Sequence, residues 1–447
     1  MLVCVAPVVA AAQDATQERV QFLAPEYFQA LKDADQAADT ALRDTLSDAI
    51  AKFQDQQYQE SLELLDSAAA RYPGLPSGRV MLARVFLATK RIQQAKSMLE
   101  QAAAFHSDYP GTYLLLGNLA MLEGRLTDAL LEYEAGGERA SSDAVPENQR
   151  RLFQLQSHAG IATVAEARND WQVARRELAA WLDLDPTNGQ ARQRLGRALF
   201  GLDQIDDAYA QLVQAQKDDP NVEPATVSMG WLHYRKGNED EAADWMKRAE
   251  TEEPNNPRVH VAVGSWLLEQ NRVDEATGHA ETLEQLAPQS PDLKMLRGSI
   301  AQAQNDYAEA ERQFDSLLKQ TPGNLAASNR LALALIEQSE QEKRQRALEL
   351  AQANARQQPN STEALSTLGW VLYKMGRLDE AERVLQASVA GGRASANTAY
   401  YLAHVLSDRG RLPQVRKLLH AALATKGPFA YREEAEKWLA EIGPGTP

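Results

Sequence analysis

Small residues and prolines recur along this chain at a fixed interval. Five alanines stand 34 residues apart, and a proline follows each of them 12 residues later. These pairs are Ala174 with Pro186, Ala208 with Pro220, Ala242 with Pro254, Ala276 with Pro288 and Ala310 with Pro322. A constant period of this length is the signature of a helix–turn–helix repeat that stacks on its neighbours as a solenoid. The pattern therefore predicts an all-α chain of paired helices, each pair ended by a proline that clashes with the preceding turn.

The interval extends in both directions and predicts about eleven repeat units. Their anchor positions are Ser61, Ala95, Ala129, Ala174, Ala208, Ala242, Ala276, Ala310, Ala347, Ala381 and Val415. Two steps are longer than the period, between Ala129 and Ala174 and between Ala310 and Ala347. We predict a loop insertion at residues 137–150, where Gly, Ser, Asp and Pro are frequent, and a polar bulge at residues 338–346. The insertion is a tolerated surface loop or a hinge between two arms of the array.

Residues 365–388 form the clearest unit, and their pattern resembles the tetratricopeptide repeat family. Leu368-Gly369 lies in the predicted first helix and Ala381 in the second. Leu-Gly recurs at 116–117 and 195–196, and glycine alone at 230, 264 and 298. The resemblance covers about residues 41–425 and implies a right-handed α-solenoid. Small residues at the Gly and Ala positions allow the two helices of a unit to cross closely.

The pattern divides the chain into six segments. Residues 1–12 are a signal segment, 13–41 a helical lead-in, 42–136 units one to three, 137–150 the insertion, 151–427 units four to eleven, and 428–447 a capping helix and tail. The capping helix is predicted because apolar residues at 435, 438, 439 and 442 share one helical face. Such a helix covers the open end of a stacked array.

Charge and cysteine content restrict the function. The formal net charge is -15 with pI near 5.1, and Lys and Arg are interleaved with Asp and Glu. A nucleic-acid partner needs a basic stripe to displace counterions, so DNA and RNA are not expected. Cys4 is the one cysteine, which excludes a disulfide framework.

Residues 2–12 are apolar and uncharged, and they end in Ala10-Ala11-Ala12, which predicts cleavage of a signal segment before Gln13. The basic residues that normally precede such a stretch are missing. We expect an exported protein of the bacterial periplasm or cell envelope, with a cytoplasmic protein as the alternative. The stretch is too short to span a bilayer, and no transmembrane segment is expected.

No motif for catalysis or cofactor binding emerges. The seven histidines are scattered, no ligand spacing completes a metal set, and there is no phosphate loop or nucleophile elbow. We therefore expect no enzyme, no catalytic residue, no cofactor and no metal.

The resemblance implies that the first helix of each unit lines a groove, with the first and fourth residues after the glycine facing inward. Those positions hold Trp231 with Tyr234 and Trp370 with Tyr373. The candidates for partner binding are therefore Trp231, Tyr234, Trp370, Tyr373, Tyr400, Tyr401 and His404, with Arg194 and Arg197 as hydrogen-bond donors to carboxylates. The alternative is that these rings pack against the neighbouring first helix and that the arginines pair with nearby acids.

Two functions from different classes follow from these residues. One is a non-catalytic scaffold that holds a protein or peptide along the groove. The other, by analogy alone, is an accessory scaffold for the assembly of envelope polysaccharides or surface proteins, with direct glycan contact.

Overall fold

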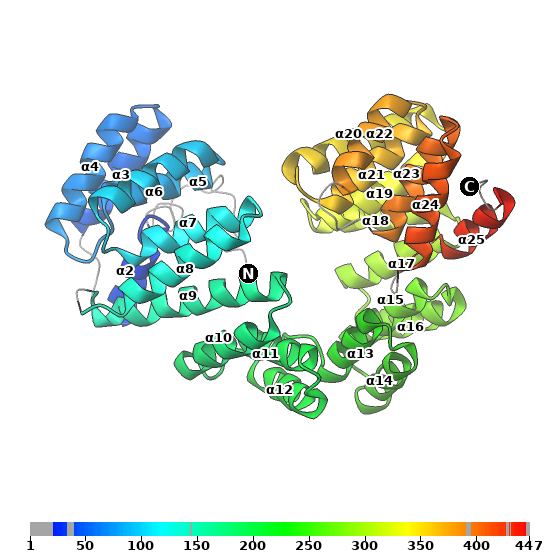
Figure 1. Cartoon of the computed structure of the whole chain (residues 1–447), viewed down its shortest axis with the longest axis horizontal. Helices are drawn as coiled ribbons and strands as arrows, with labels where there is room; N and C mark the ends of the chain where they lie inside the picture. The colour runs from blue at the N-terminus through cyan, green and yellow to red at the C-terminus, as the bar shows by residue number, and fades with distance from the viewer. Residues whose placement is uncertain are drawn as a thin grey trace. The chain divides into compact units, whose positions relative to one another are not determined.

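The fold consists of helices joined by short turns. The computed structural model describes residues 21–33, 40–143, 145–389, 395–425, 429 and 431–443. Every regular element within these ranges is an α-helix, as Figure 1 shows. The all-α prediction is therefore confirmed. The predicted signal segment, residues 1–12, lies outside the described residues.

The chain contains two compact parts, and each is built from successive helical hairpins. We call Met1–Val222 the N-terminal part and Glu223–Pro447 the C-terminal part. The hairpins of the N-terminal part are α3 (Thr40–Gln54) with α4 (Tyr58–Arg71), α5 (Gly78–Ala88) with α6 (Ile92–Phe105), α7 (Pro110–Leu122) with α8 (Leu126–Ala140), α9 (Glu147–Ala167) with α10 (Trp171–Leu184), and α11 (Gly189–Gly201) with α12 (Ile205–Asp218). Those of the C-terminal part are α13 (Ala225–Lys236) with α14 (Glu239–Glu252), α15 (Pro257–Glu269) with α16 (Val273–Leu286), α17 (Pro291–Ala303) with α18 (Tyr307–Gln320), α19 (Leu325–Ile336) with α20 (Gln341–Gln357), α21 (Thr362–Lys374) with α22 (Leu378–Val389), and α23 (Ala396–Asp408) with α24 (Leu412–Leu423).

The predicted anchor residues all lie in the second helix of a hairpin, one for each of these eleven pairs, and all are buried. The glycine of the first helix faces the second helix and leaves room for a large side chain. A Cβ atom on Gly298 would lie 2.5 Å from the ring of Phe314, and one on Gly369 would lie 2.4 Å from Cγ of Leu385. Both partners are fully buried. The glycine thus permits the close helix crossing that the repeat requires.

In ten of the eleven hairpins, all but that of α19 and α20, the turn between the two helices has one residue in the left-handed region. Glycine or asparagine takes this position in several hairpins, for example Gly124 (φ 73°), Asn271 (φ 59°) and Gly376 (φ 77°). These residues tolerate a positive φ at the end of a helix, as the sequence predicts. Lys90 and Asp203 adopt the same conformation, with φ of 60° and 59°, and their residue types gave no such indication.

The insertion predicted at residues 137–150 is mostly helical. Helix α8 continues to Ala140 and α9 begins at Glu147, so only the residues between them form the connection. Gly136 and Gly137 are helical, and the neighbouring helices lie close to both: added Cβ atoms would lie 2.8 Å from Leu114 and 2.5 Å from Ser157, so a larger residue would not fit at either position. The extra residues make α9 the longest described helix, with 21 residues. Most of the polar bulge predicted at residues 338–346 likewise belongs to α20, which begins at Gln341.

A terminal helix packs on each part. The lead-in contains α2 (Pro25–Asp33), which lies against α9 in the N-terminal part. The predicted capping helix is α25 (Arg432–Glu441), which lies against α24 in the C-terminal part.

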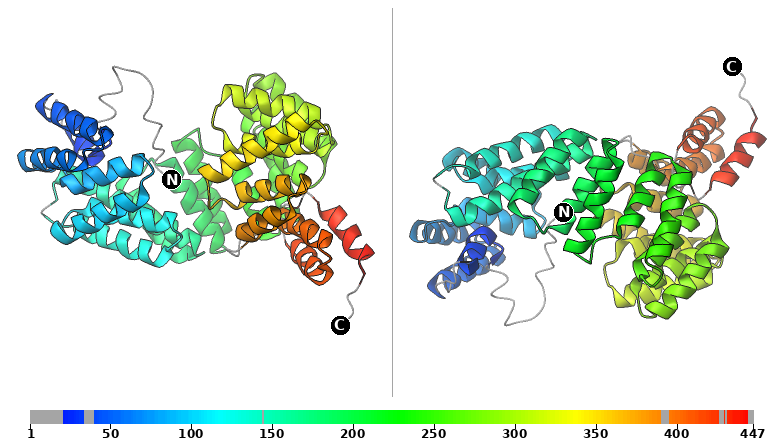
Figure 2. Two further views of the ribbon diagram at one scale, coloured as in Figure 1. Left: turned by 90° about the horizontal axis from the view of Figure 1, so that it is seen from above. Right: turned by 90° about the horizontal axis from the view of Figure 1, so that it is seen from below.

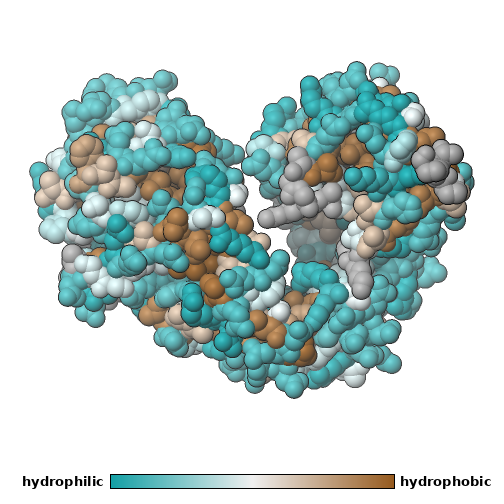
Figure 3. Space-filling view, in the orientation of Figure 1, coloured by the Kyte–Doolittle hydropathy of each residue, from teal (hydrophilic) through white to brown (hydrophobic). Residues whose placement is uncertain are grey.

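In the C-terminal part, first helices of successive hairpins touch one another, for example α19 with α21 and α21 with α23, which are labelled in Figure 1. Figure 2 shows the hairpins of each part from two further sides. We call the surface of α13, α15, α17, α19, α21 and α23 the first-helix face of the C-terminal part. The face drawn in Figure 3 is mostly hydrophilic, with smaller apolar areas between the polar ones. Among the described residues, the most exposed large apolar side chains are Phe105 and Leu131.

Candidate functional site

Trp370 and Tyr373 lie on the first-helix face but are largely engaged within the fold. The Trp370 ring stacks on Tyr401 at 4.4 Å and on Tyr373 at 5.2 Å between ring centroids. Its Nε1 donates a hydrogen bond to Oε1 of Glu337 at 3.1 Å. Lys374 pairs with the other oxygen of Glu337 at 2.7 Å and lies over the tryptophan ring. Trp370 is therefore buried, while Tyr373 stays partly exposed.

The candidates on α23 are covered by the capping helix and the residue before it. Tyr400 stacks on Tyr431 at 4.7 Å with nearly parallel rings, and the hydroxyl of Tyr401 lies 3.2 Å from that of Tyr431. His404 lies 4.4 Å from Trp438. Burial lowers the pKa of His404 to about 4 and raises that of Tyr401 to about 12, so both side chains are neutral at pH 7. Their contacts with a partner remain a prediction.

Trp231 and Tyr234 form the second predicted pair, on α13. Their ring centroids are 5.9 Å apart in an edge-on arrangement. Tyr234 is buried, and burial raises its pKa to about 12. Trp231 is partly exposed. Of the four tryptophan and tyrosine residues at the predicted inward positions, Trp231 and Tyr373 thus keep surface that a partner can contact.

Glu269, at the end of α15, was not singled out from the sequence. Its carboxylate is largely buried, and Oε2 accepts no hydrogen bond from the described residues. Burial raises the pKa of Glu269 to about 7, and the positive charges of Arg330 and Arg235 partly oppose this shift. Both arginines are exposed. Glu269, whose Oε2 accepts no hydrogen bond from the described residues, therefore lies near two exposed arginines, Arg235 and Arg330, in the C-terminal part.

The two predicted arginines belong to the N-terminal part, whereas the aromatic candidates belong to the C-terminal part. Arg194 donates to both oxygens of Glu166, at 2.9 Å and 3.1 Å, and to the hydroxyl of Thr163 at 2.9 Å. These contacts engage its donors within the fold. Arg197 is exposed.

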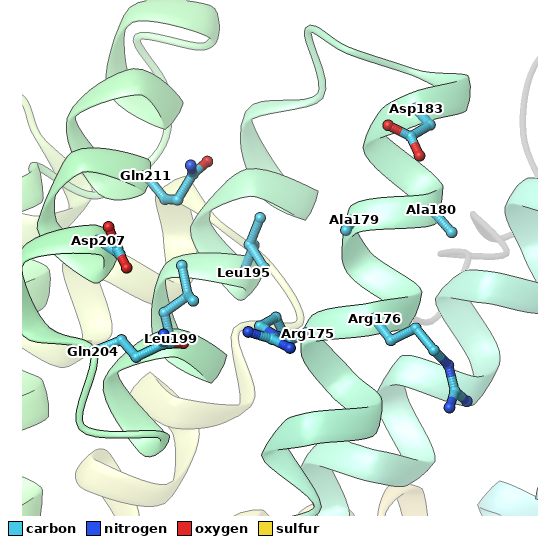
Figure 4. A pocket seen from close by; sticks show the side chains of 10 residues that line it. All are labelled: Arg175, Arg176, Ala179, Ala180, Asp183, Leu195, Leu199, Gln204, Asp207 and Gln211. Atoms are coloured by element: carbon cyan, nitrogen blue, oxygen red, sulfur yellow. The ribbon is translucent and has the colours of Figure 1, made fainter.

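A shallow groove of about 670 Å³ lies between α10, α11 and α12 of the N-terminal part (Figure 4). Its lining residues are Arg175, Arg176, Ala179, Ala180, Asp183, Leu195, Leu199, Gln204, Asp207 and Gln211. The groove is wide open and mixes both charges with apolar side chains. It holds no constellation of nucleophile, base and oxyanion donor.

The hairpin of α15 and α16 brings together two histidines that are distant in sequence. Nδ1 of His260 lies 3.1 Å from Nδ1 of His279, and Nε2 of His279 lies 3.4 Å from Oε1 of Glu250. Burial and the neighbouring His260 lower the pKa of His279 to about 4. Among the described residues, no group of three or more His, Cys, Asp or Glu has an arrangement suited to a metal ion. No helix in the same ranges is long and apolar enough to cross a membrane.

Comparison with known proteins identifies the repeat. Two tetratricopeptide repeat models match the chain, one at residues 52–105, 165–227 and 338–397, the other at residues 80–145, 261–324 and 295–343. Among curated proteins, none matches this sequence significantly.

Three solved structures illustrate what this chain is similar to. Yeast Tom70 has 13% identity and a TM-score of 0.39, with 91% of this chain and 96% of that chain covered. A tetratricopeptide repeat protein of Thermus thermophilus has 19% identity and a TM-score of 0.37, with 42% and 98% covered. A chain of the APC/C hetero-tetramer Cut9–Hcn1 has 11% identity and a TM-score of 0.41, with 93% and 92% covered.

Proposed function

This chain belongs to the tetratricopeptide repeat family, and we propose that it holds a protein or peptide partner along the first-helix face of its C-terminal part. Its repeats make it a protein-interaction scaffold. The family is generally non-catalytic, and we propose the same for this chain.

The proposal rests on aromatic and polar side chains of the first-helix face that keep surface or hydrogen-bonding capacity for a partner. The ring of Trp231 is partly exposed, and Glu269 has a buried oxygen that accepts no hydrogen bond from the described residues. Arg235 and Arg330 are exposed cations near Glu269. A peptide backbone supplies both donors for the acid and acceptors for the arginines. A partly exposed tryptophan adds contact area with little conformational entropy to lose.

The test is capture of a partner by the purified full-length chain, followed by a comparison of two tryptophan substitutions. Trp231→Ala removes the ring on the first-helix face. Trp245→Ala removes a partly exposed tryptophan from α14, a second helix of the same part, and serves as the matched control. We expect Trp231→Ala to weaken capture at least about tenfold, which is the range of an interface hot spot, and Trp245→Ala to leave it unchanged. If the two substitutions weaken capture equally, the partner does not bind the first-helix face.

The glycan alternative rests on the same partly exposed ring, because an aromatic face also stacks on a sugar. Binding of the chain to immobilised acidic or neutral glycans, with loss on Trp231→Ala, favours that alternative. Absence of glycan binding favours the protein partner. We also propose export of the chain, on the apolar residues 2–12 and their small-residue end.

A further inference from the structure

Helix α5 of the N-terminal part carries a buried cation whose partner comes from outside the hairpins. The Nη2 atom of Arg84 donates to both carboxylate oxygens of Glu26 on α2, at 3.0 Å and 2.9 Å, and Nη1 donates to the backbone oxygen of Leu23 at 3.4 Å. Both charged side chains are more than nine-tenths buried. A buried guanidinium is costly unless a carboxylate neutralises it, so Arg84 makes this surface selective for an acid.

The long α9 forms the opposite wall. Gln156 donates to Oε1 of the same carboxylate at 3.4 Å, and Gln149 donates to the backbone oxygen of Gly74, next to the ring of Tyr27. Both glutamines lie in the first half of α9, which is longer than the first helices of the other hairpins. The extra residues of the sequence thus lengthen a helix that contacts α2 (Figure 1).

Apolar side chains of α2 and the residues before it complete the contact. Leu23 and Ala24 are fully buried, and Phe28 is 3% exposed in one apolar cluster with Leu42 and Leu46 of α3. Arg43 of α3 lies 5.7 Å from the centre of the Phe28 ring. The guanidinium of Arg84, the amide of Gln156, Arg43 and the apolar residues around them form a receptor for a short helix, which we call the cradle.

A helix as short as α2, with nine residues, is not stable alone in water, so its order depends on the cradle. We propose that the cradle is a binding site for a short helical segment that carries a glutamate between apolar residues. Helix α2 occupies the site within the chain, and a partner segment of the same chemistry displaces it. The cradle lies in the N-terminal part, so this proposal stands or falls independently of the first-helix face of the C-terminal part.

The probe is a fluorescent peptide of residues 21–33, and binding is measured by anisotropy with full-length chains. Glu26→Lys in the chain places two cations together and releases α2. We expect this variant to bind the peptide, and the wild-type chain to show an apparent Kd at least about tenfold higher, because fewer than about one cradle in ten is vacant. The chain with Arg84→Glu should not bind the wild-type peptide but should bind a peptide with Glu26→Arg. Lys217→Glu on α12, an exposed site in the same part, is the control and should behave as wild type.

Hydrogen exchange on the unmodified chain gives an independent readout. Excess wild-type peptide should accelerate exchange of the α2 amides, while the Glu26→Gln peptide should leave it unchanged. If saturating peptide leaves α2 exchange unchanged, or if the charge-reversed pair fails to bind while Arg84→Glu stays folded by circular dichroism, the proposal is overturned.

Discussion

Substituting alanine for Gly369 tests whether the glycine of α21 leaves room for one side chain of the second helix, α22. A Cβ atom at this position would lie 2.4 Å from Cγ and 2.6 Å from Cδ2 of Leu385, a fully buried residue. Contacts this short force side chains or backbone to move, and overpacking of a core costs about 1–3 kcal/mol. Alanine favours a helix over glycine by about 1 kcal/mol, which offsets part of that loss. We expect a net destabilisation of up to about 2 kcal/mol.

Gly278 provides the matched control within the same part of the chain. It lies in the middle of α16, and a Cβ atom there would meet nothing within 4 Å. Gly278→Ala should therefore stabilise the protein by up to about 1 kcal/mol through helix propensity alone. The two identical substitutions should change stability in opposite directions.

Urea unfolding followed by circular dichroism gives the overall change, and hydrogen exchange of the α21 amides reports the local one, since long repeat arrays depart from two-state behaviour. Leu385→Ala adds a second check: it should be less costly in the Gly369→Ala background than in the wild type, by about 1 kcal/mol. A stabilising Gly369→Ala, or additive effects of the two substitutions, would refute the close approach of α21 and α22.

Three further predictions concern backbone strain and titration. Lys90→Gly should raise the thermal midpoint of unfolding, because a non-glycine residue in the left-handed conformation costs about 1–2 kcal/mol and the extra backbone entropy that glycine loses on folding is smaller. Gly376→Ala, which places a side chain in the same conformation, should lower the midpoint. Burial raises the pKa of Glu269 from 4.5 to about 7, so the stability of the wild-type protein should fall as pH rises through this interval. Glu269→Gln should be more stable than the wild type at pH 8 and similar to it at pH 4. The pKa of His279 is lowered from 6.5 to about 4, so the stability of the wild-type protein should decline as pH falls through that interval. The free energy of unfolding of His279→Gln, measured with urea at several pH values, should decline less over the same interval.

The repeat made most of the fold predictable from the sequence. Anchors such as Ala129, Ala242 and Ala381 identify the second helices because a residue at this position is enclosed on every side and only a small side chain fits. Each hairpin repeats the same local contacts, so one well-defined unit predicts the others. Prolines and turn glycines then set the ends of the helices.

The insertion was harder to predict because residue type alone does not decide helix length. Gly136, Gly137 and Pro146 favour a loop locally, yet both glycines lie within α8, where Leu114 and Ser157 leave no room for a larger side chain. Contacts between distant residues override the local preference. The same holds for Lys90, which takes a glycine-like conformation because the hairpin geometry requires it.

The candidate site was predictable in position more than in exposure. The spacing from Gly230 and Gly369 identified Trp231 and Trp370, but it did not indicate that one ring would be buried and the other partly exposed. That difference depends on Tyr401, which comes from the next hairpin. Glu269 carries no signal in the sequence, because its raised pKa comes from burial that only the folded chain creates.

Site-specific photocrosslinking of the chain in its native cells tests the scaffold function most directly. A photoreactive side chain is placed at Ser299, which follows the glycine of α17 as Trp231 and Trp370 follow theirs, and separately at exposed Gln285 on the second helix α16. The account predicts that Ser299 crosslinks one defined protein and that Gln285 does not. Crosslinks of equal yield from both positions, or from Gln285 alone, would contradict it.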